Sequence, residues 1–278
     1  MATNRDIIVS LVQFSADDDD RSINVGKVLQ YLNIAGDRGS KVVVLPELWT
    51  GTGASRAGRH REIADTIPGD ICHAVGEKAR EYGMFVIGSM FEASGDTVFN
   101  TAPVIGPDGG IVTKYRKTHL FNGAKRIDLP SPKSESDIVS PGDALTLVDA
   151  GFCKFGVAIC ADLRFPEIFR HYALAGAEVV VIPTAFLAPR VDHWDFLTRA
   201  RACDNQMFIL ATGMVGKERH SGTGYVGRSS VVDPWGVVQN CSNDREGCLT
   251  TTIDLDFVRE VRSWWSLNEE RRPDLYNI

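Results

Sequence analysis

Residues 156–167 read Gly-Val-Ala-Ile-Cys-Ala-Asp-Leu-Arg-Phe-Pro-Glu, and the rest of the chain is interpreted around this stretch. The apolar run 156–159 is typical of a strand buried in a sheet. Pro166 and Glu167 are typical of the first turn of a helix, which predicts a strand-to-helix transition at Cys160. A thiol near the positive N-terminus of a helix favours the thiolate form, and therefore a nucleophile. The same pattern also fits an unreactive core cysteine, the commoner environment of a single cysteine.

The composition of the 278-residue chain is that of an ordinary globular protein, with 44% hydrophobic and 24% charged residues. The formal net charge of −6 argues against a nucleic-acid partner. The six cysteines lack the paired C-x-x-C spacing of a metal site and suit a reducing compartment. The N-terminal apolar run 7–12 is only as long as a strand, and no run approaches the roughly 20 apolar residues of a membrane span. We therefore expect a cytoplasmic protein without a membrane partner.

Short apolar runs alternate with helical periodicity along the chain. The expected strands are 7–12, 41–45, 84–91, 98–106, 111–117, 144–150, 152–160, 178–183, 207–214, 228–232, 237–240 and 248–253. The expected helices are about 25–36, 70–82, 166–175 and 192–206, with a further helical start near 257. Pro107-Asp-Gly-Gly110 predicts a hairpin turn between two of the strands. This order indicates an α/β fold with antiparallel additions, in a single domain over residues 1–278.

Three residues with complementary chemistry follow three of the predicted strands. Glu47 comes after Val-Val-Val-Leu-Pro, Lys117 ends Tyr-Arg-Lys, and Cys160 ends the apolar run of the opening stretch. A carboxylate can take the proton of a thiol as a general base, and an ammonium group can stabilise an oxyanion. The backbone N–H of Ala161 can supply a second oxyanion donor. Two long segments without periodicity, 49–68 and 122–143, are expected to be loops that cover such a site.

These motifs resemble the nitrilase, or carbon–nitrogen hydrolase, superfamily, and specifically its ω-amidase-like amidase branch. The resemblance runs nearly from end to end of the chain. Further similar segments are Pro141-Gly-Asp143, His193-Trp194, Arg199-Ala-Arg-Ala-Cys-Asp-Asn-Gln206, Asp233-Pro-Trp-Gly236 and Arg272-Pro-Asp-Leu-Tyr276.

The resemblance implies a four-layer α-β-β-α sandwich of two mixed sheets. It implies a catalytic set of Glu47, Lys117 and Cys160, with Glu135 as the family's second glutamate and Ala161 as an oxyanion donor. The implied reaction converts a small primary amide and water into a carboxylate and ammonia through a cysteine thioester, without a metal or an organic cofactor. The implied substrates are amides that bear a carboxylate, such as ω-amides of dicarboxylic acids.

The basic partner of such a substrate carboxylate is left open by the sequence. Arg56, Arg126 and Arg190 are candidates, although a solvated surface arginine is the commoner interpretation of each.

The C-terminal segment, from about 257 to 278, carries an unusual apolar load for a chain end. Trp264, Trp265, Leu275 and Tyr276 all lie in it. In the resembled family this segment crosses a dimer interface, so we expect a homodimer or a higher homo-oligomer.

Several alternatives remain open at this point. A Cys–His hydrolase would use His119 or His193, but a structural hydrogen bond suits the first and a helix start suits the second. An N-carbamoyl-amide hydrolase and a nitrilase are alternatives within the superfamily, although Cys-Ala-Asp at 160–162 differs from the Cys-Trp-Glu usual in nitrilases. A non-catalytic binding protein on the same fold is the alternative of another class, and the intact Glu-Lys-Cys set argues against it.

Overall fold

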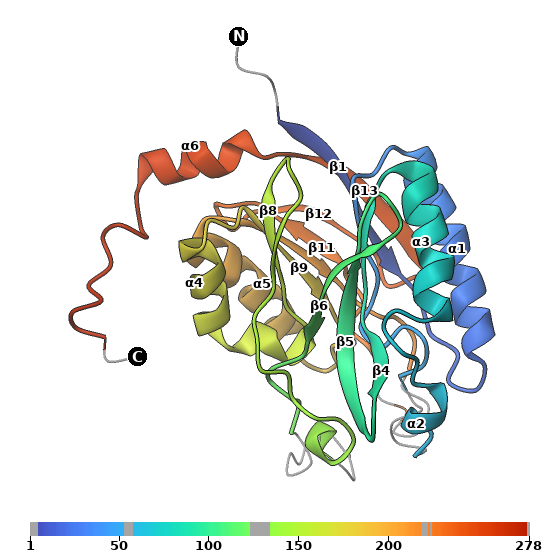
Figure 1. Ribbon diagram of the computed structural model, residues 1–278. Helices are drawn as coiled ribbons and strands as arrows, with labels where there is room; N and C mark the ends of the chain where they lie inside the picture. Colours follow the sequence, from blue (N-terminus) through green and yellow to red (C-terminus); the bar gives the residue numbers. More distant parts are fainter. Residues whose placement is uncertain (1–4, 53–57, 123–133, 218–221, 223, 277–278) are drawn as a thin grey trace.

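The computed structural model describes residues 5–52, 58–122, 134–217, 222 and 224–276. Two mixed β-sheets lie face to face, and helices cover the outer face of each sheet (Figure 1). This arrangement is the α-β-β-α sandwich that the sequence predicts.

The first sheet contains β13 (Gly247–Asp254), β1 (Asp6–Gln13), β2 (Val42–Val44), β3 (Phe85–Ile87), β5 (Thr97–Ile105) and β4 (Met90–Ser94), in that order, and β6 (Ile111–Arg116) also pairs with β5. Strands β1, β2 and β3 run parallel to one another, and the other pairs are antiparallel. The outer layer consists of α1 (Arg21–Asp37) and α3 (Asp70–Tyr82), and the short α2 (His60–Ile63) lies near β4.

The second sheet contains β12 (Val238–Cys241), β11 (Ser230–Val232), β10 (Phe208–Thr212), β9 (Val179–Pro183), β8 (Lys154–Val157) and β7 (Leu147–Asp149), in that order. Strands β8, β9 and β10 are parallel. Helices α4 (Pro166–Leu174) and α5 (Val191–Asn205) cover this sheet, and α6 (Asp256–Trp264) follows β13. Two short 3₁₀ helices, η2 (Glu135–Asp137) and η3 (Cys160–Arg164), lie in the connections.

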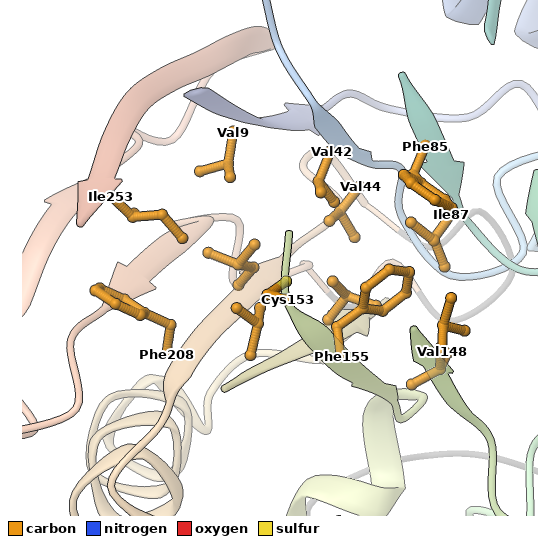
Figure 2. Packing of buried hydrophobic residues seen from close by; sticks show 14 of the residues in the cluster. Val9, Val42, Val44, Phe85, Ile87, Val148, Cys153, Phe155, Phe208 and Ile253 are labelled. Atoms are coloured by element: carbon orange, nitrogen blue, oxygen red, sulfur yellow. The ribbon is translucent and has the colours of Figure 1, made fainter. Parts of the chain in front are cut away.

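The core between the sheets explains the continuous apolar runs of the sequence (Figure 2). Strand side chains alternate between the two faces of a sheet, so a strand covered on both faces is apolar throughout. In β9, Val179 and Val181 enter the core between the sheets, whereas Val180 and Ile182 pack against the α4–α5 layer. Burial of each such side chain stabilises the fold by roughly 1.5–3 kcal/mol.

The expectation of one continuous strand over 84–91 is wrong, because Gly88 and Ser89 separate β3 from β4. A side chain at Gly88 would begin 2.5 Å from Leu45 Cβ, so only glycine fits there. Ser89 turns its hydrogen-bonding groups toward the turn after β2: its hydroxyl accepts from Leu48 N at 2.9 Å and its carbonyl accepts from Trp49 N at 3.1 Å. The interruption therefore supports the turn that carries Glu47.

The expectation that a strand delivers Cys160 directly to the N-terminus of the following helix is also wrong. Strand β8 ends at Val157, Cys160 begins η3, and α4 begins only at Pro166. The helix 70–82 and the hairpin at 107–110 have the predicted positions.

No helix within the described ranges combines the length and the apolar character needed to cross a lipid bilayer.

A buried carboxylate on β4, Glu92, binds the two basic side chains on the outward face of β6. Glu92 is 2% exposed, and it accepts hydrogen bonds from Thr101 Oγ1 at 2.7 Å and from Arg116 Nη2 at 2.8 Å, in addition to one from Lys114 Nζ. Burial raises the pKa of Glu92, but the bonds from Arg116, Lys114 and Thr101 outweigh it and lower the pKa from 4.5 to about 2. The ionised carboxylate is thus more favourable in the folded than in the unfolded chain.

We expect Glu92→Gln to lower the free energy of unfolding by about 3 kcal/mol at neutral pH. Because the folded pKa is depressed, the stabilisation is complete above about pH 4.5 and disappears as the pH falls toward 2. Urea unfolding of parent and variant should therefore show a difference that falls below half its neutral value at about pH 3. The control Glu62→Gln removes a carboxylate that is 69% exposed, and it should change stability by less than about 0.5 kcal/mol. A Glu92→Gln deficit that is independent of pH would contradict this account.

Candidate active site

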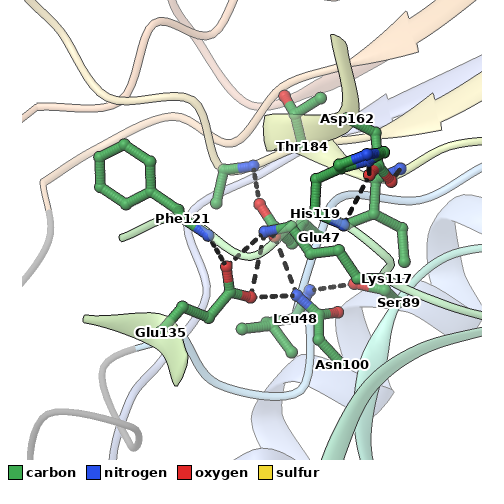
Figure 3. A network of polar contacts seen from close by, with 12 residues as sticks. Glu47, Leu48, Ser89, Asn100, Lys117, His119, Phe121, Glu135, Asp162 and Thr184 are labelled. Carbon is green, nitrogen blue, oxygen red and sulfur yellow. Dashed lines mark hydrogen bonds and ion pairs between the residues drawn. The ribbon is translucent and has the colours of Figure 1, made fainter. Parts of the chain in front are cut away.

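The three residues singled out in the sequence lie at the ends of strands from both sheets. Glu47 follows β2 and Lys117 follows β6 in the first sheet, and Cys160 follows β8 in the second. Figure 3 shows the polar network around the first two, together with Glu135 and Asn100.

Lys117 is the centre of this network, and its side chain is 2% exposed. Its ammonium group donates to Glu47 Oε1 at 2.8 Å and to both oxygens of Glu135, at 3.0 and 2.8 Å. Burial lowers the pKa of Lys117, but the charges of Glu135 and Glu47 outweigh it and hold the pKa well above its ordinary value. Lys117 is therefore a permanent cation in the resting site.

Glu135 comes from η2, in the long segment between β6 and β7. Its Oε2 accepts from Phe121 N at 2.6 Å, and its own backbone N donates to Phe121 O at 3.1 Å. Its Oε1 accepts from Asn100 Nδ2 at 3.1 Å. Together with the bonds from Lys117, each Glu135 oxygen has two donors, so the four lone-pair positions of the carboxylate are occupied.

The carboxylate of Glu47 accepts fewer hydrogen bonds than that of Glu135. Its Oε1 accepts from Lys117 and from Asn100 Nδ2, at 2.8 and 2.9 Å, and its Oε2 accepts from Ala185 N at 2.9 Å. The hydrogen bonds from the described residues therefore leave one lone-pair position on Oε2 available to a further donor.

Asn100 links the two carboxylates and was not identified from the sequence. Because carboxylates only accept, the amide must turn its NH₂ group toward Glu47 and Glu135. Its Oδ1 is consequently buried without a partner among the described residues. The pairing of the two hairpin strands was the feature that could have identified it. Lys117 N donates to Asn100 O at 2.9 Å, which places the asparagine beside the lysine.

Cys160 begins η3 with a backbone φ of 45°, which is strained for a residue with a Cβ. Burial raises the pKa of its thiol well above the ordinary value, and so do the charge of Glu47 and a hydrogen bond to that carboxylate, while Lys117 opposes them. Burial and the charge of Glu47 thus oppose the thiolate form that the sequence position alone favours, and the sequence itself also indicates a carboxylate that takes the thiol proton. The site holds a protonated thiol beside a carboxylate.

Ala161 follows Cys160 in the first turn of η3 and is 4% exposed. The first backbone N–H groups of a helix have no acceptor within the helix. The role of the Ala161 N–H as a second oxyanion donor stays a prediction.

The two histidines of the Cys–His alternative have other partners. His119 Nδ1 lies 2.8 Å from Asp162 Oδ1, and His193 Nδ1 lies 3.1 Å from Arg164 Nη1. These contacts agree with a structural hydrogen bond for His119 and give no support to the Cys–His alternative. Of the three candidate arginines, Arg190 immediately precedes α5, whereas Arg56 and Arg126 lie outside the described residues.

Across the described part of the chain, no three or more His, Cys, Asp or Glu side chains form a group that is able to hold a metal ion.

Comparison with known proteins gives consistent similarities. The model of the carbon–nitrogen hydrolase family matches residues 8–263. Omega-amidase NIT2-A of Xenopus laevis is 35% identical over 274 residues, covering 97% of this chain and 96% of the relative. Omega-amidase NIT2 of Homo sapiens is 34% identical over 262 residues, covering 93% and 92%. The crystal structure of Saccharomyces cerevisiae Nit3, a member of branch 10 of the nitrilase superfamily, matches with a TM-score of 0.86 at 28% identity, covering 98% of this chain and 100% of that chain.

We expect the parent protein to show no thiolate absorbance from Cys160 up to about pH 9, because the pKa of this thiol is raised above that value. Glu47→Gln should move the onset of ionisation to lower pH, since it removes the neighbouring negative charge that disfavours the thiolate. The measurement is the ultraviolet thiolate absorbance of each protein against pH, after subtraction of the same titration in a Cys160→Ala background.

Glu135→Gln is the matched control, because it removes the same charge from the same network. The charge of Glu135 contributes least among the causes of the raised thiol pKa, so this variant should move the onset less than Glu47→Gln does. A parent thiol that ionises near neutral pH, or equal shifts in the two variants, would contradict the assigned pairing of Cys160 with Glu47.

Proposed function

The chain belongs to the carbon–nitrogen hydrolase family, and from this premise we propose that it hydrolyses small primary amides that carry a carboxylate group. It is an amidase that cleaves an amide C–N bond by a cysteine-based mechanism, in agreement with its omega-amidase relatives. The assignment of Glu47, Lys117, Cys160, Glu135 and Ala161 to the reaction is part of the proposal.

One observation supports the assignment of roles: of the two carboxylates that bind Lys117, Glu47 is the one with an acceptor position left on Oε2, and its charge raises the pKa of the Cys160 thiol more than the charge of Glu135 does. Glu47 therefore accepts the thiol proton as the sulfur of Cys160 attacks the amide carbon. The C–S bond forms while the electrons of the carbonyl π bond move to oxygen.

Two donors receive the resulting oxyanion, Lys117 Nζ and the backbone N–H of Ala161. The three N–H groups of Lys117 all face carboxylate oxygens in the resting site. The ammonium must therefore release one of these bonds when the oxyanion forms. Glu135 is bonded through both oxygens, so the loss of one bond still leaves the lysine held by the other.

Collapse of the tetrahedral intermediate breaks the C–N bond, and Glu47 returns its proton to the departing ammonia. The acyl group stays on Cys160 as a thioester. Glu47, again ionised, takes a proton from water as the water oxygen attacks the thioester carbon. The C–S bond then breaks, the product leaves as the carboxylic acid and loses its proton to the solvent, and the proton on Glu47 returns to the thiolate.

Glu135 is assigned a positioning role, because its lone-pair positions are filled by Lys117, Asn100 and Phe121 N. It holds the ammonium in place and contributes the second negative charge that keeps Lys117 protonated.

A carboxylate on the substrate is supported by the omega-amidase names of the relatives, and Arg190, which precedes α5, is the candidate partner within the described residues. The arginine can receive the distal carboxylate as an ion pair.

We expect the purified protein to release ammonia from succinamate or glutaramate faster than from butyramide, which lacks the distal carboxylate. Cys160→Ala should lower turnover by more than about 10³-fold with the fold intact, because no other group forms the thioester. The measurement is steady-state ammonia release, with circular dichroism to verify folding of the variant.

The substrate panel also tests the alternatives. N-carbamoyl-β-alanine would give carbon dioxide together with ammonia, and 3-cyanopropionate would report a nitrilase. Preference for either compound would contradict amide specificity, and Cys160→Ala turnover within tenfold of the parent would contradict the nucleophile.

We also propose a homodimer or a larger homo-oligomer in which the C-terminal segment 257–278 takes part. Trp264, Trp265, Leu275 and Tyr276 are 46–64% exposed, and Trp235 packs edge-on against Trp264 with ring centroids 5.6 Å apart. Large exposed apolar side chains such as these are typical of surfaces that associate.

A single domain over residues 1–278 and a cytoplasmic location complete the proposal. The shared core between the sheets supports the first, and six cysteines without a disulfide support a reducing compartment.

We expect light scattering at micromolar concentration to give at least twice the mass of one chain, and truncation before Arg272 to weaken this assembly because it removes Leu275 and Tyr276. The control Ile23→Ala removes an apolar side chain that is 47% exposed on α1, away from this segment, and should leave the mass unchanged. A monomeric parent, or a truncated chain that assembles like the parent, would contradict the proposal.

A further inference from the structure

A further buried carboxyl group lies two residues after Cys160 and outside the Lys117 network. Asp162 has no exposed surface. Its Oδ2 accepts from the hydroxyl of Tyr115 at 2.8 Å and from Ile159 N at 2.8 Å. Its Oδ1 accepts from His119 N at 3.1 Å and lies 2.8 Å from His119 Nδ1.

These partners flank the two groups that we assign to the oxyanion. Tyr115 and His119 stand two residues before and two residues after Lys117, and Ile159 immediately precedes Cys160 and Ala161. Because side chains alternate along a strand, Tyr115 and Lys117 leave the end of β6 on the same side. Asp162 thus joins the segment of the lysine to the turn of the nucleophile.

The turn that Asp162 joins to β6 is strained. Cys160 has a φ of 45°, and the turn is closed on both sides, by Ile159 N bonding to Asp162 Oδ2 and by Asp162 N donating to Ile159 O at 3.0 Å. A strained conformation persists only where its surroundings determine it. The carboxyl group of Asp162 supplies those surroundings for Cys160 and Ala161.

The ring of His119 is itself held in place. It stacks on Phe165, with ring centroids 3.8 Å apart and an angle of 13° between the planes, and Phe165 follows η3 directly. The segment after Lys117 therefore contacts both the middle of η3, at Asp162, and the residue that follows η3, Phe165.

We infer that Asp162 is a positioning residue for the amide hydrolysis, which sets the Ala161 N–H and the Lys117 ammonium at a fixed separation around the oxyanion. This inference rests on the proposed function. Among the described residues, the hydrogen-bond partners of Asp162 do not include the thiol of Cys160 or the carboxylates of Glu47 and Glu135. Asp162 therefore acts through the groups that it holds in place. An oxyanion forms only in the transition state, so misplacement of its donors lowers kcat more than it raises KM.

The experiment compares kcat and KM for succinamate in Asp162→Asn and in Tyr115→Phe. Asp162→Asn replaces one acceptor oxygen by an NH₂ group that faces N–H donors, and kcat should fall about 10²-fold with KM within about threefold. Tyr115→Phe keeps the apolar ring but removes one bond to Asp162, together with the contacts of the hydroxyl to Thr118, so kcat should fall about tenfold. The second variant decides the question if the first does not fold.

Tyr172→Phe is the matched control. Tyr172 is also fully buried, and its hydroxyl donates to Val157 O at 2.6 Å, so the variant loses a comparable hydrogen bond without a bond to Asp162. It should change thermal stability about as much as Tyr115→Phe does, while its kcat stays within about twofold of the parent.

The outcomes that contradict the inference are distinguishable from failure of the proposed function. An active parent with unchanged kcat in folded Asp162→Asn or Tyr115→Phe overturns the inference, and so does a raised KM at constant kcat. Equal losses of kcat in Tyr115→Phe and Tyr172→Phe also overturn it, because the effect would then be one of general stability. A parent that releases no ammonia from any amide contradicts the proposed function itself, on which the inference depends.

Discussion

The buried ammonium group of Lys117, shared between two carboxylates, is the interaction on which the site depends. Glu47 and Glu135 would repel each other if they were buried without it, and burial of either charge alone would be strongly unfavourable. The three charges sum to −1, and this surplus adds to burial in keeping the thiol of Cys160 protonated. The arrangement that stabilises the ions is therefore the same one that makes a general base necessary.

Strand β6 shows how the fold brings these charges to one place. Its outward side chains, Lys114 and Arg116, neutralise Glu92, whereas its inward side chains at 115 and 117 reach Asp162 and Glu47. With its continuation at Lys117, one strand with a period of two thus contributes to three polar networks, one on its outer face and two on its inner face. Ion pairs on the outer face hold the strand that carries the buried lysine on the inner face.

The sequence predicted what depends on local pattern. The apolar runs, the helix 70–82 and the hairpin at 107–110 follow from periodicity and turn residues, and the family resemblance added the pairing of the two sheets. The break at Gly88 and Ser89 was missed, because it serves a turn some forty residues away in the sequence. Asn100 was missed for the same reason. In its own strand it is one polar residue among others, and its role depends on hydrogen bonds to Glu47 and Glu135, which are distant in the sequence.

Two residues with positive φ at the site show a physical reason why local sequence does not predict its geometry. Leu48, directly after Glu47, has a φ of 46°, and Cys160 has a φ of 45°. Neither type of residue favours that conformation. The first turn is held by Ser89, which lies 41 residues away in the sequence, and the second by Asp162, whose carboxylate is itself fixed by a bond from Tyr115 in β6. The local sequence would relax both turns if these bonds were absent. The position of the base relative to the thiol is therefore a property of tertiary contacts, and a peptide that contained either motif alone would lack it.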